Sequence, residues 1–127
     1  MRFSSKSDSE ILLRLYQRQG LEATLPLLRG EFAFALFDRS EDCLYLVRDR
    51  FGIKPQYWAM TPEGLVFGSE LKVLFAHPAV ERRFTSEGLF HQLMQTMVPG
   101  TTAFSGCLLY TSPSPRDMRR SRMPSSA

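Results

Sequence analysis

The apolar positions of this chain change their spacing along the sequence, and the first stretch has the period of a helix. Its apolar side chains recur three and four residues apart, at Ile11, Leu12, Leu15 and Tyr16. Ser7 and Glu10 stand before this stretch in the order of a capping box, and Gly20 is a helix terminator. The pattern predicts a helix from Ser7 to Gln19 and a second, short helix over residues 22–28.

From residue 32 onward, continuous apolar runs replace the helical spacing. Residues 32–37 and 43–47 are apolar at every position, and the polar segment 38–42 separates them. Strands that are apolar on both faces are usually covered by other layers on both sides. The pattern therefore predicts a hairpin that is buried on both faces. The other expected elements are strands over 56–60 and 65–68 and helices over 70–75 and 85–96.

One face of the first hairpin has no obvious cover in this set of elements. The predicted helices can pack on one side of its strands, and no further apolar segment remains for the other side. We therefore expect one of two outcomes. Either the strands are less buried than their composition indicates, or part of the fold lies outside this sequence.

The net charge adds little to this picture, because its excess is confined to one end. The chain has 127 residues and a formal net charge of +3, which taken alone is typical of a protein with an anionic partner. Residues 1–106 carry 12 basic and 12 acidic side chains, so the excess lies in residues 107–127, which hold four arginines and one aspartate. We expect no nucleic-acid partner for the folded part.

Residue content excludes several classes of protein. Two cysteines, Cys43 and Cys107, are too few for a disulfide framework, and no CxxC motif or histidine cluster indicates a metal site. The N-terminus lacks the apolar run of a signal peptide, and the longest uncharged stretch, residues 88–115, is too polar for a membrane span. No glycine-rich phosphate loop is present. We expect a cytoplasmic protein without a membrane partner.

Four short segments occur in an order and spacing that is specific to one family. They read SDSE at 7–10, LRGEFAFA at 28–35, RDRFGIKP at 48–55 and GSELK at 68–72. Together they resemble the glutaminase domain of asparagine synthetases, a class II glutamine amidotransferase, over residues 2–106. The resemblance implies an α+β fold, the N-terminal-nucleophile hydrolase αββα sandwich with antiparallel sheets, of which this chain is similar to the C-terminal part. It implies that residues 1–84 are the C-terminal part of the amidotransferase domain. Residues 85–106 would then form a helix and the start of a linker to a synthetase domain.

The resemblance also implies a mechanism. The family's nucleophile is a cysteine that follows the initiator Met, and its own α-amine acts as the base. Glutamine gives up ammonia, and a synthetase domain in the same chain amidates aspartate with ATP and Mg. This chain has Arg2 at that position, and Cys43 lies in a predicted strand. We therefore expect no catalytic residue, no cofactor and no glutaminase activity in this fragment. A homodimeric parent is compatible with the family.

One site residue follows from the resemblance. Asp8 matches the aspartate of the family's Ser-Asp segment, which binds the α-ammonium group of glutamine. A carboxylate can pair with that cation. The alternative is that Asp8 is an acidic residue of the first turn that favours the helix dipole. With the resemblance, the ligand role is the preferred prediction.

The other candidates are interpreted as structural. The Arg48-Asp49-Arg50 segment could bind an anion, but an ion-paired turn between two hairpins is the preferred interpretation. His77 and His91 have no Asp, Cys or second His at a triad or metal spacing. Cross-strand packing is expected for an aromatic cluster in the second hairpin, at Tyr57, Trp58 and Phe67.

Residues 107–127 differ in composition from the rest of the chain. They include five serines, three prolines and four arginines, which is typical of a disordered basic segment. The resemblance stops at Cys107, and the string CLLYTSPSPRD reads as translated adapter sequence. Two alternatives to the main interpretation remain open. One is another class II amidotransferase, of the amidophosphoribosyl, hexosamine-forming or β-lactam synthetase type. The other is a non-catalytic binding module with a basic arm.

Overall fold

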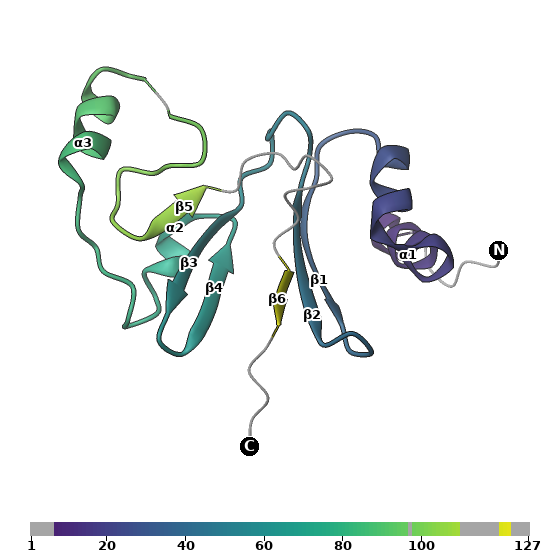
Figure 1. Cartoon of the computed structure of the whole chain (residues 1–127). Coiled ribbons are helices and arrows are strands. Elements are labelled where there is room, and N and C mark those ends of the chain that lie inside the picture. Colours follow the sequence, from purple (N-terminus) through teal and green to yellow (C-terminus); the bar gives the residue numbers. More distant parts are fainter. Residues whose placement is uncertain (1–6, 97, 110–119, 123–127) are drawn as a thin grey trace. The chain divides into compact units, whose positions relative to one another are not determined.

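The computed structural model describes residues 7–96 and 98–109, and the backbone of residues 120–122 (Figure 1). The chain forms two compact units, residues 1–30 and residues 31–127. No helix in the described ranges is long and apolar enough to cross a membrane.

The first unit consists of helix α1 (Asp8–Thr24) and a short 3-10 helix, η1 (Leu25–Leu27). The side chain of Ser7 caps α1, because its Oγ accepts a hydrogen bond from the N–H of Ser9 at 3.3 Å. Gly20 has φ 77° and ψ 173°, which no helical residue adopts, so α1 is two helical segments joined at a kink. The predicted interruption at Gly20 is confirmed.

In the second unit, strands β1 (Ala33–Asp38) and β2 (Cys43–Arg48) form the first antiparallel hairpin, with Ala33 opposite Arg48 and Asp38 opposite Cys43. The Asp38 carboxylate shapes the turn by accepting the N–H of Ser40 at 2.8 Å. Strand β6 (Arg120–Arg122) pairs with β2, so the sheet order is β1-β2-β6. The hairpin expected from the two apolar runs is confirmed.

The second antiparallel sheet contains β3 (Tyr57–Thr61), β4 (Gly64–Gly68) and β5 (Cys107–Leu109), in the order β4-β3-β5. The hairpin of β3 and β4 is the one that the sequence predicts. Strand β5 is not, because residues 107–109 were expected to begin a disordered segment. The expected disorder of residues 107–127 is wrong at residues 107–109, which form β5, and at residues 120–122, which form β6. The side chain of Cys107 is buried in a core cluster on one face of the sheet, and Leu108 packs on the other face.

Two apolar clusters hold this unit together. Leu46 of β2 and Trp58 of β3 form one cluster, against which Leu44, Leu65 and Leu108 pack, and it joins the two sheets face to face. The other cluster lies on the opposite face of the second sheet and includes Leu74 of helix α2 (Leu71–Leu74). Mixed helix and strand with antiparallel sheets is the fold class expected from the sequence.

Strand β1 is less buried than its continuous apolar run predicts. Ala35 and Phe37 pair with Leu46 and Leu44 of β2, so they share the face that meets the other sheet, yet both are exposed. The contact between the sheets is made by β2 on one side and by β3, β4 and β5 on the other, and β1 lies at the edge, outside this contact. The expected burial on both faces is therefore wrong for β1 within this chain.

The predicted aromatic cluster divides between the two faces of its sheet. Trp58 lies opposite Phe67 in the register of β3 and β4, which is the expected cross-strand pair. Tyr57 is the adjacent residue in the strand, so its side chain points to the other face, where it packs on the cluster that includes Ala59.

Helix α3 (Ser86–Leu93) ends three residues before the predicted end of its segment. Thr85 caps its start, with Oγ1 accepting the N–H of Gly88 at 2.9 Å. At the other end Gln95 has a positive φ of 53°, and the N–H of Thr96 turns back to the carbonyl of His91 at 2.9 Å.

Candidate functional site

The start of α1 carries the site residue that the sequence predicts. Ser7 is extended at φ −82° and ψ 135°, and Asp8 is the first helical residue. The side chain of Asp8 is exposed. It has no hydrogen bond or ion pair with any residue in the described part of the chain. A free carboxylate on a fixed backbone can receive a cationic group, and acidic side chains at this position also favour the helix dipole.

Glu10 stands in the same first turn and differs from Asp8 in its contacts. Its carboxylate lies 3.6 Å from the guanidinium of Arg14, one helical turn further along. Both acidic side chains therefore lie in the first turn of α1, close to the positive end of the helix dipole. Of the two, Glu10 has a cationic partner within the helix. This difference makes Glu10 a matched reference for Asp8.

The Arg48–Lys54 turn follows β2 and lies in the second unit. Asp49 is buried, and its carboxylate accepts three backbone N–H groups: those of Phe51 at 3.1 Å and Ile53 at 3.0 Å on Oδ1, and that of Lys54 at 3.0 Å on Oδ2. Arg48, also buried, donates from Nε to the carbonyl of Lys54 at 2.6 Å and from a terminal nitrogen to the carbonyl of Gly52. Both charged side chains therefore bind the backbone of the turn.

The hydrogen bonds fix the protonation state of Asp49. Burial by itself would raise the pKa of its carboxyl group, but hydrogen bonds from backbone groups, led by those of Lys54 and Ile53, outweigh burial and hold the pKa below its ordinary value of 3.8. The carboxylate is ionised and fully engaged, so the segment is a locked turn and not an anion site. The interpretation as a turn is confirmed: hydrogen bonds from Arg48 and Asp49 to its backbone hold it, and Lys54 forms an ion pair with Glu31.

The close approach of Arg48 explains the glycine in this turn. Gly52 has φ 64°, and a Cβ atom there would lie 2.9 Å from Cζ of Arg48. Phe51, beside it, is 86% exposed. At the end of the turn, Lys54 Nζ lies 3.2 Å from a carboxylate oxygen of Glu31.

Neither cysteine is placed to act as a nucleophile. Cys43 and Cys107 are both buried, and burial raises the pKa of the Cys107 thiol above its ordinary value of 9.0. A reactive thiol requires exposure and a lowered pKa. The sequence-based expectation that Cys43 lies within a strand is confirmed, because it is the first residue of β2.

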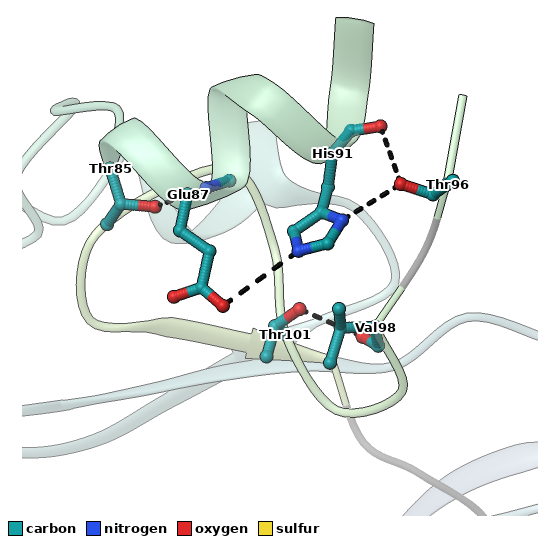
Figure 2. Close-up of polar contacts among 7 residues, drawn as sticks. Thr85, Glu87, His91, Thr96, Val98 and Thr101 are labelled. Atoms are coloured by element: carbon teal, nitrogen blue, oxygen red, sulfur yellow. Dashed lines mark hydrogen bonds and ion pairs between the residues drawn. The ribbon is translucent and has the colours of Figure 1, made fainter. Parts of the chain in front are cut away.

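The histidines have partners that the sequence analysis missed. His77 lies 3.2 Å from a carboxylate oxygen of Glu63. His91 lies 3.9 Å from Glu87, and its Nδ1 is 2.8 Å from Oγ1 of Thr96 (Figure 2). The signal in the sequence was the glutamate four residues before His91, which a search for aspartate and cysteine overlooks. Within the described ranges, no three His, Cys, Asp or Glu residues gather as metal ligands would.

Comparison with known proteins adds evidence that is independent of this geometry. A family model described as a glutamine amidotransferase domain matches residues 1–109. The chain is 39% identical over 82 residues to the glutamine-hydrolyzing asparagine synthetase 2 of Bacillus subtilis (strain 168), which covers 65% of this chain and 11% of that protein. It is 37% identical over 106 residues to asparagine synthetase 3 of the same organism, covering 82% and 17%.

A human protein shows the same similarity. The chain is 42% identical over 73 residues to the glutamine-hydrolyzing asparagine synthetase of Homo sapiens, covering 57% of this chain and 13% of the human protein. The chain therefore spans between about a tenth and a sixth of the length of the curated relatives it matches. The family match runs through β5 and includes residues 85–106, for which the sequence predicts a helix and the start of a linker.

Proposed function

Because this chain belongs to the glutamine amidotransferase domain family, we propose that it is part of a glutamine-dependent asparagine synthetase. The family match over residues 1–109 carries this proposal, together with identities of 37–42% to glutamine-hydrolysing asparagine synthetases. In such an enzyme, glutamine hydrolysis supplies ammonia, and polypeptide outside these 127 residues uses ATP and Mg to amidate aspartate. Glutamine is then the substrate of this domain, and the cytoplasm is its expected compartment.

We assign the binding of the α-ammonium group of glutamine to Asp8. Three observations support this role: the carboxylate is exposed, it has no partner in the described part of the chain, and a capped helix start fixes its backbone. A hydrogen bond between a carboxylate and an ammonium group is among the stronger polar contacts, at about 1.5–3 kcal/mol.

The test uses the full reading frame recovered from genomic DNA. Asn in place of Asp8 removes the charge and keeps the size of the side chain, so Asp8→Asn is expected to raise the KM for glutamine about 10- to 100-fold. Synthesis driven by added ammonia bypasses the glutamine site, so its rate is expected to stay unchanged. Asparagine formation is measured with each nitrogen source in turn.

Glu10→Gln is the matched control, because it removes an acidic group from the same first turn. If both substitutions raise the KM equally, the effect comes from the helix terminus and the ligand role of Asp8 is wrong. If the wild-type protein forms no asparagine with either nitrogen source, the proposed enzyme is wrong. Transfer of ammonia to another acceptor would identify a different amidotransferase.

A further inference from the structure

Helix α3 carries an apolar patch on its outer side. None of the eight residues of α3 is buried. Four neighbouring apolar side chains are each between 43% and 74% exposed: Leu89, Phe90, Leu93 and Met94. At helical spacing these residues lie on one side of α3, and we call them the α3 patch. Exposed apolar groups gathered in this way mark interaction sites more often than isolated ones do.

Helix α3, which carries the patch, packs closely on the segment that follows it. A Cβ atom at Gly88 would lie 2.6 Å from Cα of Ala103, so the helix rests closely on residues 101–105. Phe84, before the helix, stacks on Phe104 with ring centres 4.4 Å apart. On the polar side of α3, His91 contacts both Glu87 and Thr96 (Figure 2). A surface that is already ordered loses little entropy when a partner binds.

The charge of α3 favours a protein partner over a membrane surface. Helices that lie in a membrane interface carry lysine and arginine on their polar face. Helix α3 contains neither, and its only acidic residue is Glu87. The α3 patch itself is uncharged, as the centres of protein interfaces are.

The size of the patch and the length of the relatives indicate that its partner is tethered to it in the same polypeptide. Stable complexes between separate chains bury about 800 Å² on each partner, more than four partly exposed side chains offer. A tethered partner needs less area, because its effective concentration reaches about the millimolar range. The matched relatives have most of their length outside the matched stretch. Residues 101–105, which support α3, lead into β5 at the end of the family match.

We propose that the α3 patch docks against the part of the asparagine synthetase polypeptide that lies outside the amidotransferase domain. The inference rests on the proposed function, and it names the surface through which this domain contacts the rest of its chain. Leu93, the most exposed of the four side chains, is expected at the centre of the contact.

Hydroxyl-radical labelling of methionines tests this proposal without an activity assay. Met94 and Met60 are 59% and 62% exposed, so they start from similar reactivity in the 127-residue chain. In the full-length protein, the labelling of Met94 relative to Met60 is expected to fall about tenfold, since docking excludes water from the patch. Leu93→Lys is expected to restore the labelling of Met94 in the full-length protein. Gln92→Lys, which adds the same charge outside the patch, is expected to leave Met94 protected.

The other possible results separate failure of the docking proposal from failure of the proposed function. An unchanged ratio of Met94 to Met60 in an active full-length enzyme overturns docking and leaves the proposed function standing. Binding of the 127-residue chain to anionic phospholipid vesicles, lost in the Leu93→Lys variant, would identify the patch as a membrane contact. A gene that ends at Ala127 overturns both proposals, whereas a protected Met94 in a protein without asparagine synthesis overturns only the function.

Discussion

Arg48 and Asp49 are adjacent charged residues, and both are buried and bind backbone groups of the turn that follows β2. The carboxylate of Asp49 accepts hydrogen bonds from three N–H groups of the turn, which have no partner in a neighbouring strand. The guanidinium of Arg48 donates hydrogen bonds to two carbonyl groups of the same turn. Buried backbone groups need such partners. The sequence could not distinguish this arrangement from an anion site, because both use the same residues in the same order.

Asp49→Asn is expected to destabilise the fold by about 1.5–3 kcal/mol at neutral pH. An amide has one acceptor oxygen, whereas Asp49 uses both oxygens, and the new NH₂ group would face an N–H donor. Urea unfolding followed by circular dichroism measures the change. Asp38→Asn is the control, because the hydrogen bonds from Ser40 and Glu41 go to a single oxygen, Oδ1. A loss of similar size at both positions would contradict the structural role of Asp49.

The difference in stability between the wild type and the Asp49→Asn variant is expected to depend on pH. The pKa of Asp49 is lower in the folded chain than its ordinary value of 3.8, so its stabilisation is complete above pH 3.8. It is lost as the pH falls through the lowered folded value, where the carboxylate becomes protonated. The difference in unfolding free energy between wild type and Asp49→Asn is expected to be constant from pH 5 to 7 and to shrink below about pH 3.8. A difference that grows toward acid pH would show that another group is responsible.

At the scale of elements, local signals in the sequence located both hairpins and the kink at Gly20. These features depend on neighbouring residues: apolar runs, a polar turn, and a residue that tolerates positive φ. Strand β5 has no such signal, because three residues are too few for a period. It forms because Cys107 and Leu108 each meet a cluster built from distant parts of the chain. The pairing of β5 with β3 is therefore a tertiary contact that local pattern cannot predict.

Gly88→Ala separates the local and tertiary contributions to α3. In an isolated helix this substitution gains about 1 kcal/mol from higher helix propensity. Here the added Cβ would lie 2.6 Å from Cα of Ala103, and overpacking of this kind costs about 1–3 kcal/mol. The structure therefore predicts a net loss of stability, with faster hydrogen exchange in α3. Gln92→Ala, on the same helix, is the control and is expected to change stability by less than about 0.5 kcal/mol. A stabilised Gly88→Ala variant would show that α3 does not rest on residues 101–105.

At the scale of the molecule, the placement of both thiols predicts the chemistry of the 127-residue chain. Cys43 and Cys107 are buried on different strands, so neither can attack glutamine in the folded state. The folded chain is expected to release no ammonia from glutamine. In an assay with Ellman's reagent, no thiol should react rapidly in buffer, and two should react in guanidinium chloride. Rapid reaction of a thiol in buffer, or ammonia release above the blank, would contradict this placement.

The sequence by itself determined the family, both hairpins, the helix start at Ser7 and the candidate role of Asp8, because each depends on residues close together in the chain. Tertiary structure decided which faces of the strands are buried, since the contact between the sheets lies at β2, β3, β4 and β5 and leaves β1 open. It also decided that Arg48 and Asp49 bind backbone and that residues 107–109 complete a sheet. Burial and pairing depend on residues far apart in sequence, and the apolar pattern of a strand is the same whether or not another layer covers it.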